Sequence, residues 1–473
     1  MKKGKMREFM KKKLLALGIA GIMIAGLTAC GGGAAKTDSA AASKAAEKAA
    51  EEAVEEAVVE EAVEEAVVEE AAAEAAAGSG EEVKITIFNT KSEIQDAFEE
   101  MAAEYSAEHD GVTIEVYYSS DTVAAHLASK YAANDPYTIS MVDPKDIYSL
   151  APDHAIDLSD QDWVSHTQYA ISVDDKVVGF PVCIEARGVI YNADAVEAIT
   201  GETFNPEDYA TLDAFTALLE TMRQGGIEGP TAIQKEDWSL SAHYIQEVYE
   251  EQPDVQKFVD SLYDGSADLV NNEKFNSMMD TFDVLKEYNY MKGAEISAER
   301  ETSEAMLATG EVAFMFGGNW DWSLIKDFEP SENMGMMPVP QNMDDGTNEM
   351  LVGGGSKMFF IDSSDKTSDA QRQAAKDFLN WLVFDEAGNE FLTVQCAVIP
   401  AFDNIDTSAL DPLSASVKEY ADAGALVPNY DYDPDDHIPS VGASMQKYLA
   451  GEIDRPTLAT EISDYWKNAK RPS

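Results

Sequence analysis

The chain has 473 residues, of which 45% are hydrophobic and 9% aromatic, enough apolar side chain for the cores of two or three domains or lobes. It carries 88 acidic and 34 basic residues, a formal net charge of -54. Binding to nucleic acid needs clustered cations that neutralise phosphates, so this charge argues against a nucleic-acid partner.

The N-terminus has the features of a targeting segment. Seven basic residues precede an apolar stretch, LLALGIAGIMIAGLTA at 14–29, which is typical of a secretory signal and short for a lasting membrane span. It runs into LTAC at 27–30, which resembles a bacterial lipobox, in which small residues admit the signal peptidase and the Cys30 thiol accepts a diacylglycerol. The alternative is a chance cysteine after an ordinary signal. We expect a signal peptide at 1–29 and a lipidated Cys30 that holds the protein at the extracellular face of the cell membrane, as in Gram-positive bacteria, by its lipid anchor only.

A segment of biased composition follows, to about Gly80. EEAVEEAVV at 51–59 is repeated at 60–68, and this composition favours local helix even though Glu residues at i,i+4 spacing repel one another. We interpret residues 30–82 as the lipidated cysteine and a stalk. The alternative is an amphipathic helix that binds a partner, although alanine buries little area.

From Glu81 onward the pattern changes to alternating strands and helices. VKITIF at 83–88 predicts a strand, residues 92–109 an amphipathic helix and VTIEVYY at 112–118 a second strand, and the alternation continues to the end of the chain. It predicts an α/β fold with mainly parallel sheets, whose ligands bind beyond the carboxyl ends of the strands.

The loop after the first strand lies at such an end. Lys91 and Glu93, with Thr90 and Ser92 beside them, are therefore candidates to line a pocket. The alternative is that Thr90 or Ser92 caps the following helix.

Four stretches further along the chain carry a resemblance to a known family. They are GFPVCIEARGVIYNADAV at 179–196, TLDAFTALLETMR at 211–223, EAMLATGEVAFMFGGNWDW at 304–322, and QAAKDFLNWLVFDEAGNEFLTVQCAVIPAF at 373–402. In this order and behind a lipobox, the sequence resembles an extracellular solute-binding protein of ABC importers, family 1, the maltose-binding-like carbohydrate type, from about Val83 to Lys470. The resemblance implies a two-lobe periplasmic-binding-protein fold of type II. Its lobes would close over a sugar or oligosaccharide by hinge motion, and the protein, as a monomer, would deliver the ligand to the permease subunits of an ABC importer.

The resemblance also implies the limits of the two lobes. The N-terminal lobe would comprise 83–184 and 351–396, and the C-terminal lobe 185–350 and 397–473. Cys183 and Cys396 lie at the inferred passages between the lobes. Because each has apolar neighbours, we predict two free, buried thiols, with a disulfide between them as the alternative.

The stretch GGNWDW at 317–322 is the strongest candidate for ligand contact. Sugar rings present apolar C–H faces surrounded by hydroxyls, so a receptor needs flat aromatic rings and polar side chains. Trp320 matches the tryptophan that stacks on sugar in the family. Gly317 and Gly318 would let the backbone turn and bring Asn319 and Trp320 into the cleft, while Trp322 begins a helix and is expected to pack on its inner face.

The resemblance supplies two acidic candidates. Glu185 matches a cleft carboxylate at the first passage between the lobes, although an ion pair with Arg187 is an equal alternative. Asp143 follows a strand and matches an acidic sugar ligand, and its alternative role is to cap the turn before Pro144.

Further candidates rest on a looser match. Trp238 and Asp237 lie where the second lobe supplies aromatic and acidic contacts, and Gly353 and Gly354 indicate a close approach of the backbone or a plain bend. The stretch 430–442 has no tryptophan where maltose-binding-type proteins add a stacking platform, which puts maltodextrin in doubt. Tyr430, Tyr432 or His437 can substitute.

Motifs of enzymes and metal sites are missing from the sequence. It contains no HExxH, GxSxG, Walker A loop or GxGxxG, and its six histidines show no metal-ligand spacing. We expect no catalytic residue, no metal and no cofactor. Two alternatives remain: a glycoside hydrolase, whose paired carboxylates need no local motif, and a stalked surface adhesin that binds glycan without closing.

Overall fold

A computed structural model describes residues 82–119, 122–430, 432–434 and 436–471. The predicted signal peptide, Cys30 and the stalk lie outside the described residues. The described residues belong to one unit that begins at Gly80, and no helix among them is long and apolar enough to cross a membrane.

The predicted strand–helix–strand opening is confirmed. β1 (Val83–Asn89) pairs in parallel with β2 (Val112–Tyr118), and α3 (Gln95–Glu108) connects them. The alternative role of Thr90 or Ser92, a cap for the helix, does not hold, because neither side chain caps η1 (Ser92–Ile94) or α3. Instead the Asn89 side chain accepts a hydrogen bond from the Lys91 backbone N–H at 2.9 Å and donates one to the Lys91 carbonyl at 2.9 Å, so the strand's last residue shapes the turn.

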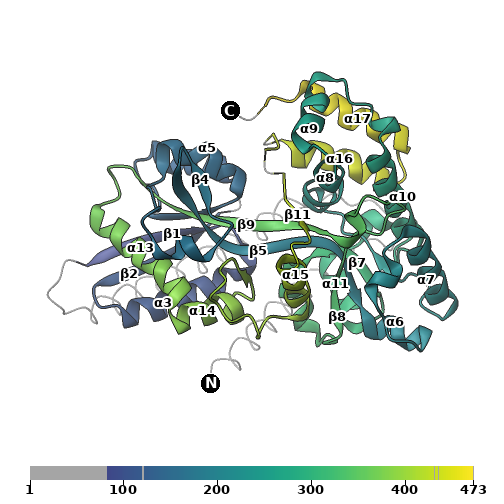
Figure 1. Cartoon of the computed structure of the whole chain (residues 1–473), viewed down its shortest axis with the longest axis horizontal. Coiled ribbons are helices and arrows are strands. Elements are labelled where there is room, and N and C mark those ends of the chain that lie inside the picture. The colour runs from purple at the N-terminus through teal and green to yellow at the C-terminus, as the bar shows by residue number, and fades with distance from the viewer. Residues whose placement is uncertain (1–81, 120–121, 431, 435, 472–473) are drawn as a thin grey trace, which may run out of the picture. The chain divides into compact units, whose positions relative to one another are not determined.

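The first lobe is a sheet covered by helices on both faces (Figure 1). Its buried residues form two clusters, one around Phe98, Trp163 and Phe359 and one around Phe88 and Phe360. Besides β1, β2 and α3, its strands and helices are β3 (Ile139–Val142), β4 (Ile171–Val173), α4 (Val123–Ala132), α5 (Pro144–His154), α13 (Asp369–Phe384), α14 (Glu386–Glu390) and the π-helical turn η10 (Phe391–Gln395).

The second lobe contains shorter strands and more helices than the first. Its largest cluster of buried residues includes Phe215, Phe282 and Trp466. Its elements are β6 (Thr231–Ala232), β7 (Phe314–Gly318), β8 (Met334–Met337), β11 (Leu426–Val427), α6 (Ala193–Thr200), α7 (Leu212–Gln224), the π-helix η4 (Ser239–Ile245), α8 (Gln246–Glu250), α9 (Val255–Asp264), α10 (Glu273–Glu287), α11 (Arg300–Thr309), α12 (Trp322–Ile325), α15 (Pro412–Asp422), α16 (His437–Leu449) and α17 (Arg455–Asn468).

Short 3₁₀ turns complete the described chain. They are η1 (Ser92–Ile94), η2 (Asp162–His166), η3 (Pro206–Tyr209), η5 (Leu269–Asn271), η6 (Glu295–Ser297), η7 (Asn319–Asp321), η8 (Lys326–Phe328) and η9 (Thr347–Glu349).

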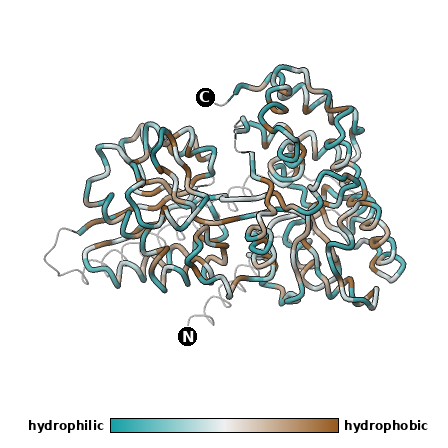
Figure 2. Tube along the Cα trace, viewed as in Figure 1, coloured by the Kyte–Doolittle hydropathy of each residue, from teal (hydrophilic) through white to brown (hydrophobic). Residues whose placement is uncertain are grey.

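Helix α7 shows how the sequence specifies such an element. Thr211 accepts a hydrogen bond from the backbone N–H of Ala214, which satisfies a free donor at the helix start. The buried side chains Leu212, Phe215, Leu218, Leu219 and Met222 follow at intervals of one to three residues and lie on one face of the helix. Figure 2 shows the same contrast over the molecule, with hydrophobic residues along the strands and hydrophilic ones on outer helical turns.

Two long strands join the lobes. β5 (Lys176–Asn192) and β9 (Leu351–Ile361) run antiparallel and side by side through the middle of the fold (Figure 1). Every antiparallel pair among the described strands includes β5 or β9, whereas β1–β2, β1–β3 and β6–β7 are parallel. The crossing strands therefore bring residues of both lobes to one place.

The two cysteines lie near this crossing. Cys183 is in β5, and short strand β10 (Ile399–Pro400) pairs with β5 opposite Cys183 and Ile184. Cys183 and Cys396 are both buried and free, as predicted. After Cys396, Val398, Phe402 and Ile405 pack in the first core, whereas Ile399 and Ala401 pack in a third buried cluster.

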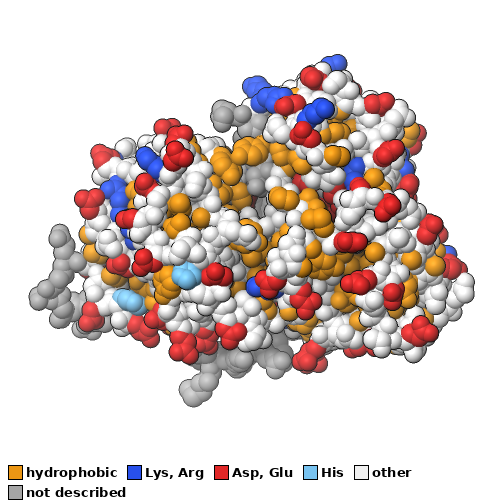
Figure 3. All heavy atoms as spheres, viewed as in Figure 1, with side chains coloured by type: hydrophobic (Ala, Val, Ile, Leu, Met, Phe, Trp, Pro, Cys, Tyr) orange, Lys and Arg blue, Asp and Glu red, His pale blue; other side chains and the backbone are white. Residues whose placement is uncertain are grey.

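The surface reflects the acidic composition. On the face in Figure 3, acidic side chains are spread widely and outnumber basic ones, so no broad basic patch is visible there.

Candidate functional site

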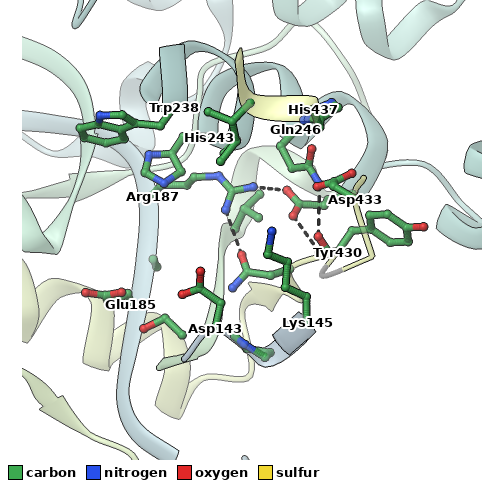
Figure 4. A pocket seen from close by; sticks show the side chains of 18 of the residues that line it. Asp143, Lys145, Glu185, Arg187, Trp238, His243, Gln246, Tyr430, Asp433 and His437 are labelled. Atoms are coloured by element: carbon green, nitrogen blue, oxygen red, sulfur yellow. Dashed lines mark hydrogen bonds and ion pairs between the residues drawn. The ribbon is translucent and has the colours of Figure 1, made fainter. Parts of the chain in front are cut away.

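Two cavities lie beside the crossing strands. Cavity A has a volume of about 270 Å³ and is shown in Figure 4. Cavity B has a volume of about 650 Å³. Five residues line both cavities: Glu185, Trp238, His243, Trp320 and Lys357.

Three rings form a wall between the cavities, which we call the aromatic wall: Trp238, His243 and Trp320. The centroids of the Trp238 and His243 rings are 5.2 Å apart with the rings nearly perpendicular, and those of His243 and Trp320 are 4.6 Å apart. All three side chains are only partly exposed. The enclosure of His243, together with Arg187, Arg300 and Lys357, keeps its pKa well below the usual value, so the ring is neutral and adds no charge to the wall.

The glycines before Trp320 have a steric reason. A Cβ at Gly318 would lie 2.3 Å from the Trp320 ring, and one at Gly317 would lie 2.0 Å from a carboxylate oxygen of Asp321. The backbone N–H of Gly318 donates a hydrogen bond to that carboxylate at 3.0 Å. The turn can therefore fold the indole back over its own strand only because both positions lack a side chain.

Neighbouring residues of this turn point elsewhere. Asn319 is buried, accepts a hydrogen bond from the backbone N–H of Ala186 at 3.1 Å and is not among the residues lining the two cavities. It ties the turn to β5. Trp322 packs against a third buried cluster, which includes Leu307 and Ile325, as predicted.

On the side of the first lobe, an ion pair connects the loop after β1 with the crossing strand β5. The Lys91 ammonium lies 2.5 Å from a carboxylate oxygen of Glu185 and 2.8 Å from one of Glu93. Burial alone would lower the pKa of Lys91, but Glu185 and Glu93 outweigh it and raise the pKa well above its usual value. Glu185 thus pairs with Lys91 and not with Arg187.

A second ion pair links Lys357 of β9 with Asp143, the residue before α5. The enclosure of Asp143 would raise its pKa, but Lys357 more than offsets this effect and the pKa is lowered. Asp143 lines cavity A and does not cap α5 with its side chain.

Arg187 is the buried cation of cavity A. Its guanidinium forms an ion pair with Glu250 and donates a hydrogen bond to Asn429 at 2.9 Å (Figure 4). It also lies 3.5 Å from a carboxylate oxygen of Glu247. Burial raises the pKa of Glu250 to about 7 in spite of Arg187. One cation therefore serves two carboxyl groups that are both nearly inaccessible to water.

The C-terminal segment closes cavity A. Gln246 donates hydrogen bonds to Asp433 at 2.6 Å and to the Tyr430 carbonyl at 3.2 Å. His437 is buried, and burial, with Lys145 nearby, lowers its pKa to about 3. Tyr430 and His437 line the cavity, whereas Tyr432 lies with its ring centroid 5.2 Å from that of Tyr148 in α5.

Most of the predicted site residues meet here. Trp320, Glu185 and Trp238 line both cavities, Asp143 lines cavity A, and Lys91 and Glu93 line cavity B.

The other predicted candidates lie outside the residues lining these cavities. Asp237 accepts a hydrogen bond from the Trp238 backbone and packs against Gly442. A Cβ at Gly353 would lie 2.4 Å from the Glu185 carbonyl oxygen, so this glycine allows β5 and β9 to approach, while Gly354 faces open space.

Several lining residues carry little signal in the sequence. Lys145, His243, Gln246, Arg300 and Lys357 were not among the candidates. The one usable signal was Lys357, a cation inside the otherwise glycine-rich and apolar strand LVGGGSKMFFI.

The site offers faces of aromatic rings, paired charges and hydrogen-bonding groups, an arrangement suited to binding a polar ligand. No group of three or more His, Cys, Asp or Glu side chains in the described ranges could hold a metal ion.

The fold and the cleft define a two-lobe binding protein. A sequence model of bacterial extracellular solute-binding proteins matches residues 100–425, and the chain belongs to this family.

Solved structures have the same fold. Apo RafE from Streptococcus pneumoniae has a TM-score of 0.66 and 18% identity over 82% of this chain and 98% of that chain. A sugar transporter from Bacillus licheniformis in complex with stachyose has a TM-score of 0.61 and 18% identity over 82% and 100%. An ABC-transporter binding protein from Bifidobacterium animalis subsp. lactis in complex with mannobiose has a TM-score of 0.58 and 17% identity over 82% and 94%. The predicted two-lobe α/β fold class is confirmed.

Proposed function

We propose that the protein captures a neutral sugar or oligosaccharide in cavities A and B and delivers it to the permease of an ABC importer. The observation that carries this proposal is the aromatic wall, because flat rings that face two cavities lined by both apolar and polar side chains match the alternating apolar and hydroxylated surfaces of sugars. The sugars bound by the structural neighbours support the same class of ligand.

The charges of the cleft favour a neutral ligand. Lys91 pairs with Glu185 and Glu93, Lys357 with Asp143, and Arg187 with Glu250. A charged ligand would have to compete with these pairs, whereas hydroxyl groups can bond to the remaining donors and acceptors without separating them.

A thermal-shift panel tests the proposal. Raffinose, stachyose, mannobiose and chitin oligosaccharides would be compared with a uronic-acid oligosaccharide of similar length. Because a ligand that binds only the folded state stabilises it by mass action, about 2.7 kcal/mol at a hundredfold excess over Kd, at least one neutral sugar should raise the melting temperature. A shift with the acidic oligosaccharide alone would contradict the proposal.

We further propose that the ligand is bound without chemical change. The sugar recovered after overnight incubation should be intact, and cleavage products would instead support a glycoside hydrolase. Small-angle scattering separates the adhesin alternative, since only a protein whose lobes close should become more compact with ligand.

We propose lipid anchoring at Cys30 and a monomeric state. Cys30→Ser should release the protein into the medium or leave the signal uncleaved, whereas the parent partitions into the detergent phase. A parent protein found wholly in the aqueous phase would contradict the anchor. The proposed lobe limits are those predicted, except that the second lobe resumes after Ile405, because Ile405 still packs in the first core.

A further inference from the structure

Arg300 lines cavity B and makes two contacts at the aromatic wall. Its guanidinium carbon lies 4.6 Å from the centroid of the Trp238 ring. The same guanidinium forms an ion pair with Asp321, the residue after Trp320. A single side chain therefore contacts one ring of the wall and the turn that carries another.

These contacts form a closed circuit. Arg300 stacks on the Trp238 ring, whose centroid lies 5.2 Å from that of the His243 ring. The His243 centroid lies 4.6 Å from that of Trp320, and the next residue, Asp321, forms the ion pair with Arg300. Asp321 also accepts the Gly318 N–H at 3.0 Å, so its carboxylate fixes the turn before Trp320 as well as the cation.

Buried carboxyl groups fix Arg300 in turn. Its Nε lies 2.9 Å from Glu304, one turn further along α11, and the side chains of Glu304 and Asp321 are both fully buried, whereas that of Arg300 is 18% exposed. A guanidinium held by two buried carboxyl groups has little freedom to turn away from the Trp238 ring.

We propose that Arg300 is a positioning residue that sets the aromatic wall for ligand binding, with no need to touch the ligand itself. This inference rests on the proposed function, since it assumes that the wall contacts the sugar. Because Trp238 and Trp320 face both cavities, loosening the wall weakens contacts on either side of it.

Arg300→Lys is the sharpest variant. Lysine keeps the positive charge between Asp321 and Glu304 but loses the planar group that stacks on Trp238 and binds two partners at once. Arg223→Lys is the matched control, because Arg223 lies 4.4 Å from the Tyr288 ring and pairs with Glu220 and Glu287 in the same lobe, away from the two cavities.

Two readouts are measured on the parent and both variants: affinity for stachyose and mannobiose by calorimetry, and near-ultraviolet circular dichroism without ligand. Arg300→Lys should weaken affinity roughly three- to thirtyfold and change the tryptophan bands, with a melting temperature close to that of Arg223→Lys. Arg223→Lys should leave affinity and the tryptophan bands as in the parent.

The outcomes separate the two ideas. Parent-like tryptophan bands in Arg300→Lys, or changed bands with unchanged affinity for a sugar that the parent binds, would overturn the positioning role. If the parent binds no neutral sugar of the panel, the proposed function fails, and the ligand-free bands still show whether Arg300 fixes the wall.

Discussion

Arg187→Met is expected to lower the free energy of unfolding by about 3 to 5 kcal/mol, the cost of removing one partner of a buried ion pair. Arg187, Glu247 and Glu250 are each less than a tenth exposed. Methionine has a similar length, so the loss comes from two carboxyl groups left without their cation and not from an empty space. Urea denaturation of the parent and the variant measures it.

The loss should grow with pH. Burial already raises the pKa of Glu250 to about 7 and that of Glu247 well above its usual value, and both would rise further without Arg187. An acid with a raised pKa in the folded state contributes stability below its unfolded pKa and loses it as pH rises through the folded pKa. In the parent, the contribution of Glu250 to the free energy of unfolding is lost by about pH 7 to 8. In the variant, whose Glu250 pKa is higher, that contribution continues to fall above this pH. The difference in free energy of unfolding between parent and variant should therefore be larger at pH 8.5 than at pH 6.

Arg455→Met is the control for this experiment. Arg455 also pairs with two carboxylates, Asp280 and Asp283, but its side chain is 24% exposed and theirs are 55% and 43% exposed. Pairs in contact with water contribute about 1 kcal/mol or less. Equal losses in the two variants, or a loss that shrinks as pH rises, would show that Arg187 does not compensate buried charge.

The sequence could predict those features that depend on local pattern. The opening strands and helix followed from apolar periodicity, and their bounds agree with β1, α3 and β2. Trp320 could be singled out because two glycines and an apolar strand precede it, and the structure gives both glycines a steric reason.

Other features depend on residues that are far apart in the chain. Lys91 and Glu185 are separated by 94 positions, and Arg187 and Glu250 by 63, so no local spacing identifies which acid each cation binds. Proximity in sequence favours an ion pair between Glu185 and Arg187, but in the structure each residue pairs with a distant partner. His243 lies in a π-helix and Gln246 follows it, and because such a helix has a different period, helical spacing could not show that both face cavity A.

The second large effect that we expect is a loss of sugar affinity when Trp320, the candidate for stacking on the sugar, is replaced. Trp320→Ala should weaken affinity for the bound sugar by about 1 to 3 kcal/mol, or roughly 5- to 150-fold. The indole lines both cavities and packs against the His243 ring, so its loss removes a ring face and joins the two cavities. Stability should change little, because Trp320 belongs to none of the buried clusters described above.

Trp322→Ala is the matched control, two residues away in the same turn and helix. Trp322 packs against the buried cluster around Leu307 and Ile325 and does not line cavity A or B. It should therefore lower the melting temperature and leave affinity close to that of the parent, the reverse of Trp320→Ala. Calorimetric titration and thermal unfolding of the three proteins test both effects together. If Trp320→Ala keeps the parent's affinity for a sugar that the parent binds, the indole does not stack on the ligand, and the aromatic wall has to be assigned a structural role.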